Sequence, residues 1–194
     1  QRMTSRNDSQ SSTRVLVLSH DLVGPQMAGP GMRCWELARV LARTCEVTLA
    51  GPLEAELWVE TTGTDADFVV KLIDEYPGRL PGLSKEEQDA YPGGRQMLVR
   101  GEPFRGRFRD SYEVPQPFTP GQPTRIAFRI NDVLHTFQRG HRIMIQIQSS
   151  WFPYIDRNPQ KYVPNIFEAA PEDFQRATHR LLRSAAHPSR LGVQ

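Results

Sequence analysis

The sequence has 194 residues and a net charge of +2, from 24 basic and 22 acidic side chains. This length suits one domain whose core needs neither disulfides nor metals, and the near balance of charge predicts no nucleic-acid partner. No apolar run approaches the ~20 residues that a membrane span requires, so no membrane association is expected. Residues 1–13 are polar, contain no apolar signal segment and are predicted to form a disordered tail, which makes the cytoplasm the default compartment.

The stretch from residue 14 to residue 49 has the order strand, glycine-rich loop, helix, strand. Arg14–Ser19 is a short apolar run of strand type, and a loop of glycine and proline follows over His20–Gly31. Met32–Arg43 carries apolar residues at spacings of three and four, which is typical of an amphipathic helix. Cys45–Leu49 is the second predicted strand. This βαβ order places backbone amides and a helix N-terminus where an anion could bind.

Several residues of this stretch resemble the first βαβ unit of glycosyltransferases built from two Rossmann-like domains. They are Ser19-His20-Asp21, Gly24-Pro25, Ala28-Gly29-Pro30-Gly31, Arg33 and Trp35-Glu36-Leu37-Ala38. The resemblance covers only the first unit of a much larger fold, and turn formation is the favoured role of its glycines. A glycosyltransferase remnant that binds a sugar nucleotide stays an alternative.

From Gly51 onward, short strands alternate with turns rich in proline and glycine. Strand-like runs are predicted at Glu56–Thr62, Phe68–Asp74, Gln96–Arg100, Arg125–Ile130 and Arg142–Gln148. Tyr76–Gly94, with three prolines and four glycines, is predicted to be a long exposed loop. Such a series of strands without a long helical period favours a β-sandwich or jelly roll.

Arg142–Gln148 has the most regular pattern of these runs. Ile143, Ile145 and Ile147 occupy every second position, which is the period of a strand with one dry face. Unpaired amides beside a row of isoleucines invite aggregation, so we expect this strand to lie in the middle of a sheet.

Periodicity alone does not decide between a helix and a strand for the C-terminal segment. Pro171-Glu172-Asp173-Phe174 is a good helix start, since proline and acidic residues are favoured in the first turn. Apolar residues could continue this helix to Leu182. Thr178–Arg183 could instead form a strand after a single helical turn, and we favour the strand because of the family resemblance described next.

Many sequence blocks of the C-terminal part occur in the order of one known family. They are Ala55–Val59, Thr61–Asp74, Arg105–Arg109, Pro117–Gly121, Gly140–Ile143, Gln148–Pro153, Asp156–Pro159 and Ala177–Arg180. Through them, residues 47–194 resemble the C-terminal jelly-roll domain of the X-Pro dipeptidyl-peptidase and α-amino-acid ester hydrolase (cocaine esterase-like) family. The resemblance implies a mainly β, galactose-binding-like jelly-roll β-sandwich, here with an N-terminal βα extension at residues 14–46. A natural fusion, an engineered one and a mis-assembled reading frame all fit that extension.

The resemblance also implies a function. In that family the jelly roll follows an α/β-hydrolase domain whose catalytic serine lies in a G-x-S-x-G motif. No such motif occurs here, because Gly82-Leu83-Ser84 continues into Lys85-Glu86. We therefore expect no catalytic residue and no cofactor, and a role as a non-catalytic module that packs on a hydrolase domain and shapes its substrate cleft. A homo-oligomer is a further expected partner, and a carbohydrate-binding jelly roll is the alternative from another functional class.

The loop that follows Arg142–Gln148 is the candidate contact surface. Its aromatic and charged residues have the composition of a protein interface: Trp151, Phe152, Tyr154, Asp156 and Arg157. By analogy with the family, we predict that this loop faces the hydrolase domain. Simple packing of the same aromatics into the core remains the competing interpretation.

The five histidines show no metal-type spacing and are interpreted as structural or exposed, so no metal is predicted: His20, His135, His141, His179 and His187. Arg105, Arg107 and Arg109 could contact phosphates. A charged strand face is the favoured interpretation, with these arginines paired to Asp65, Asp67 or Asp110 in exposed ion pairs that contribute little.

Overall fold

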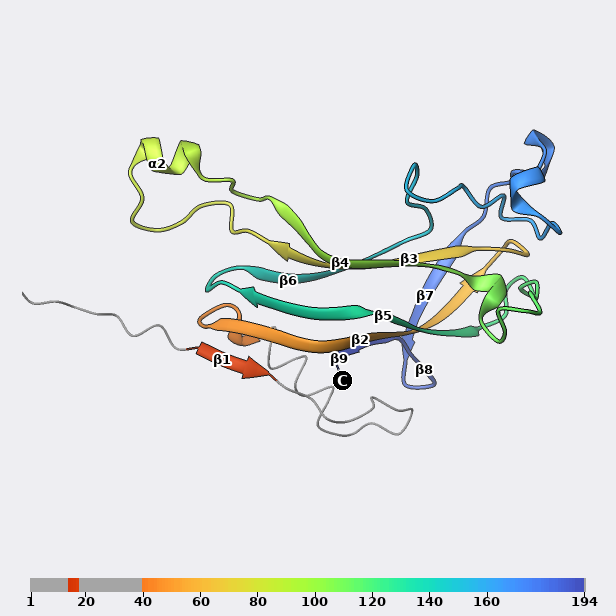
Figure 1. Ribbon diagram of the computed structural model, residues 1–194, viewed down its shortest axis with the longest axis horizontal. Coiled ribbons are helices and arrows are strands. Elements are labelled where there is room, and N and C mark those ends of the chain that lie inside the picture. Colours follow the sequence, from red (N-terminus) through yellow and green to blue (C-terminus); the bar gives the residue numbers. More distant parts are fainter. Residues whose placement is uncertain (1–13, 18–39, 194) are drawn as a thin grey trace, which may run out of the picture.

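The computed structural model describes residues 14–17 and 40–193, which form a β-sandwich of two sheets (Figure 1). Its strands are β1 (Arg14–Val17), β2 (Glu46–Thr61), β3 (Asp67–Glu75), β4 (Gln96–Arg105), β5 (Thr124–Phe137), β6 (Arg142–Gln148), β7 (His179–Ser184), β8 (His187–Pro188) and β9 (Arg190–Val193). One short α-helix, α2 (Lys85–Ala90), and three 3-10 turns, η1 (Gly106–Phe108), η2 (Ile166–Glu168) and η3 (Pro171–Asp173), lie in the connections. The prediction of a mainly β sandwich is confirmed.

The larger sheet, sheet A, is built around the long strand β2. On one side β2 pairs antiparallel with β5, and on the other it pairs in turn with β1, β9 and β7. The separate strands predicted at Cys45–Leu49 and Glu56–Thr62 are thus two parts of one strand. The register with β5 shifts between Gly51 and Leu53, and Gly51 has a φ of 124°, a conformation that favours glycine. The sequence predicted two strands because the strand pattern is interrupted at Gly51. An irregularity of this kind bends a strand without ending it.

Sheet B has three antiparallel strands in the order β4-β3-β6. Within the described part of the chain, β6 pairs with β3 alone, so it is an edge strand. The prediction that Arg142–Gln148 lies in the middle of a sheet is therefore wrong. Alternation shows which face of a strand is dry, but it does not report the number of neighbouring strands, since edge and central strands share the same side-chain period.

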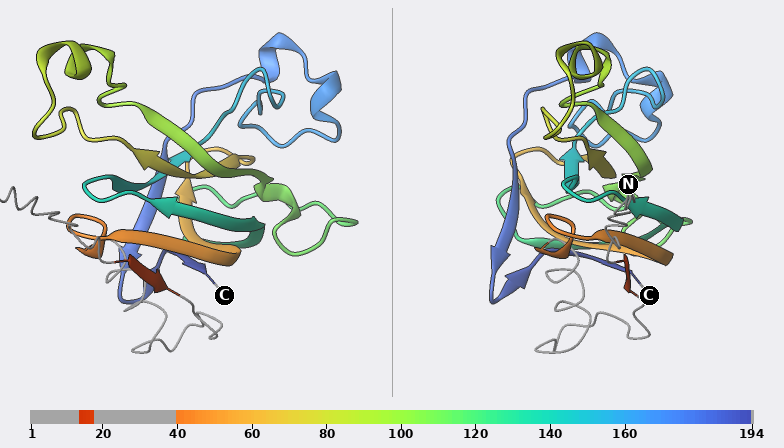
Figure 2. Two further views of the ribbon diagram at one scale, coloured as in Figure 1. Left: turned by 60° about the vertical axis from the view of Figure 1, so that its left-hand side comes forward. Right: turned by 90° about the vertical axis from the view of Figure 1, so that its left-hand side faces the viewer.

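The hydrophobic core fills the space between the two sheets, which lie one over the other (Figure 2). Alternate residues of β3, namely Phe68, Val70 and Leu72, point into it and are almost fully buried. They meet residues of β2 and β5 with the same period: Val47, Leu49, Leu53, Leu57, Ile126, Ile130 and Phe137. Burial on this scale contributes about 1.5–3 kcal/mol for each large aliphatic or aromatic side chain.

Two connections differ in how well they were predicted. The Tyr76–Gly94 segment, predicted as a loop, contains α2, whose N-cap Ser84 accepts a hydrogen bond from the Glu87 amide. At the C-terminal end the single helical turn η3 is followed by β7, which confirms the predicted strand. No helix of the described chain is long and apolar enough to cross a membrane.

The N-terminal extension contacts the sandwich. β1 pairs in parallel with the first residues of β2, Arg14 against Glu46 and Val17 against Leu49, as the strand–helix–strand order predicts. The predicted loop and most of the predicted helix lie outside the described residues. Val40 and Leu41 are helical, and Ala42 is buried in the core while its carbonyl accepts a hydrogen bond from the Gly140 amide at 3.0 Å.

Candidate domain interface

The outer face of sheet B is the surface from which the candidate interface rises. Residues of β3 that point away from the core include Val69, Lys71 and Ile73, and their register partners on β4 are Pro103, Gly101 and Leu98. Val69 and Ile73 are buried although they lie outside the main core cluster. Part of this face is therefore covered by the chain itself, and Trp151, which follows β6, covers Gly101 and Lys71.

Trp151 packs onto this face over Gly101. An added Cβ at Gly101 would come within 2.9 Å of the Trp151 ring, so only glycine leaves room for the indole. The Lys71 ammonium lies 4.0 Å from the centroid of the same ring, a cation–π contact, and burial lowers the pKa of Lys71. Trp151 is half-buried. It is therefore neither a fully buried core residue nor a fully exposed interface residue, which were the two alternatives left open by the sequence.

The other predicted interface residues lie next to Trp151 or β4 and face solvent. Phe152 and Tyr154 keep 59% and 71% of their surface exposed, far more than core packing would allow. The Tyr154 ring contacts Trp151 at a centroid distance of 4.7 Å, and the Arg157 guanidinium lies 4.5 Å from the Phe152 ring. Asp156 is 4.0 Å from Arg105 of β4. The structure therefore brings all five residues to one surface.

A buried polar network fixes the C-terminal end of this loop. Asn158 donates a hydrogen bond of 2.9 Å from its side-chain amide to Asp67, whose other carboxylate oxygen accepts one from Arg105 at 3.3 Å. Burial raises the pKa of Asp67 to about 6, against the lowering effects of the Arg105 charge and the Asn158 hydrogen bond. Because its anchors are buried and bonded, the loop presents its aromatics from a defined position.

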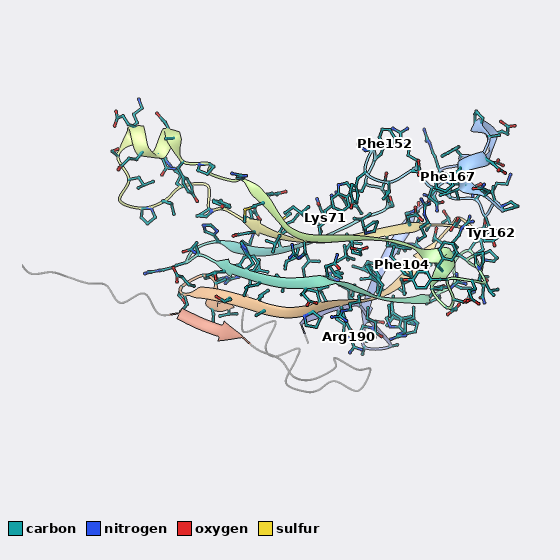
Figure 3. The ribbon with its side chains drawn as sticks, in the orientation of Figure 1. Lys71, Phe104, Phe152, Tyr162, Phe167 and Arg190 are labelled. Carbon is teal, nitrogen blue, oxygen red and sulfur yellow. The ribbon has the colours of Figure 1, made fainter. Side chains whose placement is uncertain are left out.

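One exposed aromatic on the same side was not predicted. Phe167, in η2, is 74% exposed and lies 5.9 Å from the Arg105 guanidinium. Figure 3 shows Phe152 and Phe167 above β3 and β4, on the side of the sandwich away from β2. A lone phenylalanine among polar residues gives no sequence signal of this position. We call Trp151, Phe152, Tyr154 and Phe167 together the aromatic surface.

The outer face of sheet A has a different character, because ion pairs cover it. Glu56 accepts hydrogen bonds from Arg125 at 2.7 Å and from the Nε of Arg190 at 2.9 Å, and Glu60 pairs with Arg180 at 2.5 Å. Burial alone would raise the pKa of Glu56, but the two arginines outweigh it and the pKa is lowered. Of the two outer faces, the one on sheet B carries the aromatic surface.

The three arginines at positions 105, 107 and 109 are paired with acids, as predicted, but they do not form one face of a strand. Arg107 lies in the 3-10 turn η1, where it is buried and bonded to Asp65. Arg109 lies 3.6 Å from Asp110 and donates to the carbonyls of Gln116 and Pro117. The expectation of exposed, weak pairs is wrong for Arg107, since the partner that buries it comes from the distant β2–β3 turn.

The histidines of the described chain have structural partners. His135 and His141 both bond the buried carboxylate of Asp74, at 2.9 and 2.8 Å. His179 packs against Phe68, and burial lowers its pKa. No group of three or more potential metal ligands is present among the residues that the structure describes.

Comparison with known proteins gives this surface its context. The chain is 30% identical over 152 residues to cocaine esterase from Rhodococcus sp. (strain MB1 Bresler), which covers 78% of this chain and 23% of that protein. It is 42% identical to an aminopeptidase from the marine sediment archaeon Thaumarchaeota archaeon, with a TM-score of 0.69 over 76% of this chain and 23% of the other.

An α-amino acid ester hydrolase is also 42% identical, with a TM-score of 0.67 over 77% of this chain and 24% of the other. The chain thus spans about a quarter of the length of these relatives. A model of the X-Pro dipeptidyl-peptidase C-terminal non-catalytic domain matches residues 44–192. The chain therefore belongs to this family of non-catalytic C-terminal domains.

Proposed function

We propose that this module packs on an α/β-hydrolase domain through the aromatic surface and helps to shape the substrate cleft of that domain. The exposure of Phe152 and Tyr154 on a rigidly anchored loop carries the proposal. Exposed aromatics with arginine neighbours are the residues that dominate binding at protein interfaces. The size of the hydrolase relatives supports it as well, since the matched segment is about a quarter of each.

The proposed role needs no reactive group in the module itself. A serine reacts only with a general base and an oxyanion hole beside it, and cleft shaping requires neither. The contribution would instead be positional. A domain that buries aromatic side chains against the rim of a cleft excludes water and holds substrate-contacting loops in place.

A domain exchange tests the proposal. Residues 44–192 would replace the matched segment of the α-amino acid ester hydrolase, and ester turnover of the fusion would be measured. The fusion should be active, and Phe152→Ser with Tyr154→Ser should lower its kcat/KM and its thermal stability. Leu134→Ser is the matched control, because Leu134 is 80% exposed on β5 of sheet A and should be silent. Equal effects of both changes would refute the proposal.

A second candidate, sugar binding, is favoured by a separate groove. Between β4 and β5 lies a groove of about 340 Å³ lined by Glu102, Pro103, Phe104, Arg105, Phe108, Tyr112, Phe128 and Arg129. Tyr112 is 78% exposed and its ring lies 6.2 Å from Phe108 in a stacked arrangement. Retention on a glycan array that Tyr112→Ala abolishes would support this candidate, whereas no retention of the native chain would eliminate it.

A further inference from the structure

Glu102 is a half-buried acidic residue in the groove between β4 and β5. Its register partner on β3 is Val70, which points into the core, so Glu102 lies on the core side of sheet B. Among the residues that the structure describes, none donates a hydrogen bond to its carboxylate or forms an ion pair with it. Even Arg100, two residues earlier on β4, donates instead to the Asp132 carbonyl at 2.6 Å. The carboxylate is thus partly removed from water without a partner in this chain.

The two arginines that line the groove are already paired with other acids. Arg105 lies 3.3 Å from the buried carboxylate of Asp67, and Arg129 lies 3.1 Å from Asp132. With these pairs counted, the charged residues that line the groove leave one net negative charge, on Glu102. The charge of the groove therefore complements a cation.

The walls of the groove are four aromatic rings in mutual contact. Phe104 and Phe128 stack with their centroids 4.8 Å apart, and Tyr112 meets Phe104 edge to face at 6.5 Å. Phe108 stacks on Tyr112 at 6.2 Å. The faces of such rings attract cations, most strongly where water is partly excluded. Aromatic walls with one unpaired carboxylate are the composition of a site for an organic cation.

A guanidinium group fits this composition better than an ammonium group. It is planar and weakly hydrated, so it stacks on aromatic faces, and its fork of N–H donors matches both oxygens of a carboxylate. The groove volume of about 340 Å³ lies at the lower end of the range for ligand sites, about 300–1,000 Å³. That volume suits a single long side chain.

The groove is continuous with the aromatic surface through Arg105. This residue lines the groove, and its guanidinium also lies 5.9 Å from the ring of Phe167. A domain that packs on the aromatic surface therefore also reaches the groove. We propose that an arginine side chain of the hydrolase domain inserts into the groove, stacks on its rings and pairs with Glu102. This inference rests on the proposed packing of the module on that domain and adds a specific contact to it.

The first experiment tests the groove in the chain itself. Nα-acetyl-arginine amide, titrated into the ¹⁵N-labelled chain, should cause saturable shifts of the Glu102 and Tyr112 amide resonances. Nα-acetyl-citrulline amide has nearly the same shape without the charge and should not bind. Glu102→Gln should weaken binding of the arginine probe about tenfold, because the neutral amide loses the charge-assisted hydrogen bonds. Glu113→Gln is the matched control, since Glu113 is exposed and does not line the groove.

The second experiment tests the occupant in the fusion with the α-amino acid ester hydrolase described above. Phenylglyoxal modifies accessible arginines, and mass spectrometry identifies the modified sites. One arginine of the hydrolase domain should be protected in the fusion and should become reactive in the Glu102→Gln variant. Glu113→Gln should leave it protected. The arginine probe should no longer bind the fusion, because the groove is filled.

Three results would overturn the proposal. They are equal binding of the arginine and citrulline probes, unchanged binding in Glu102→Gln, and retention of neutral glycans in the groove that Glu102→Gln does not alter, which would assign the groove to sugar. Thermal melts of Glu102→Gln separate loss of the site from loss of the fold.

The fusion distinguishes failure of this inference from failure of the proposed function. If the fusion binds the arginine probe as tightly as the isolated chain, the groove stays open and this inference is wrong. Phe152→Ser with Tyr154→Ser would still lower kcat/KM in that case, because the packing on the aromatic surface does not depend on Glu102.

Discussion

The Arg107 guanidinium donates two hydrogen bonds to one oxygen of Asp65, from Nε at 2.9 Å and from Nη2 at 2.5 Å, and both side chains are buried. Its remaining terminal nitrogen donates to the Val163 carbonyl at 2.9 Å, and its plane lies 4.6 Å from the Tyr162 ring. One side chain thus connects the β2–β3 turn to the segment that follows the aromatic loop.

Loss of this arginine should be costly. Arg107→Ala leaves the Asp65 carboxylate buried without its cation, and we expect a loss of roughly 3–5 kcal/mol in the free energy of unfolding. Arg180→Ala removes an exposed pair with Glu60 and should cost about 1 kcal/mol or less. Urea unfolding of both variants measures the two losses. Similar losses would contradict the expectation that the buried pair contributes more to stability than the exposed one.

Asp67 should make stability depend on pH. Its folded pKa of about 6 lies above the ordinary value of 3.8, so the native state binds more protons than the unfolded state between these values. The free energy of unfolding should therefore decrease as pH rises from about 4 to about 6. In Asp67→Asn this contribution disappears. Thermal melts of the two proteins across this range check it, and parallel curves would contradict the assignment.

Gly101 should control the position of Trp151. Gly101→Ala places a methyl group 2.9 Å from the indole, so the ring must move away from Lys71. One of the three tryptophan indole resonances in a ¹⁵N spectrum should then shift, with a small loss of stability. Gly78→Ala is the control, because a methyl group there meets nothing within 4 Å. Unchanged indole resonances in Gly101→Ala would contradict the packing of the Trp151 ring on Gly101.

The cap of α2 should matter only locally. Ser84→Ala removes the hydrogen bond from the Glu87 amide, which is worth about 1 kcal/mol to a helix. Because no residue of α2 is buried, global unfolding should hardly change while amide exchange in residues 85–90 accelerates. Lys85→Ala, in the first turn, should leave exchange as it is. A large drop in global stability with Ser84→Ala would mean that α2 has tertiary contacts.

The strands could be read from the sequence because apolar residues recur with a period of two. α2 was missed although its capping box, Ser84 followed by Glu87, stands in the sequence, because proline and glycine on both sides indicated a loop. The buried state of Arg107 could not be foreseen. It depends on Asp65, 42 residues earlier, and only the folded chain brings the two together.

The candidate interface was predicted in part. Composition identified the loop from Trp151 to Arg157, and the structure brings its five predicted residues to one surface. Composition could not show that Phe167 joins them, since this requires the position of η2 relative to Arg105. The edge position of β6 was likewise hidden, because the number of neighbours of a strand is a property of topology.

The four pairings of β2 have a consequence for biosynthesis. This strand leaves the ribosome before β5, β7 and β9, which complete its hydrogen bonding. Contacts between such distant segments form slowly, and the waiting strand exposes apolar side chains meanwhile. A stop codon before Arg190 would therefore yield a product that chaperones retain or proteases remove, even though most of the core residues would be present.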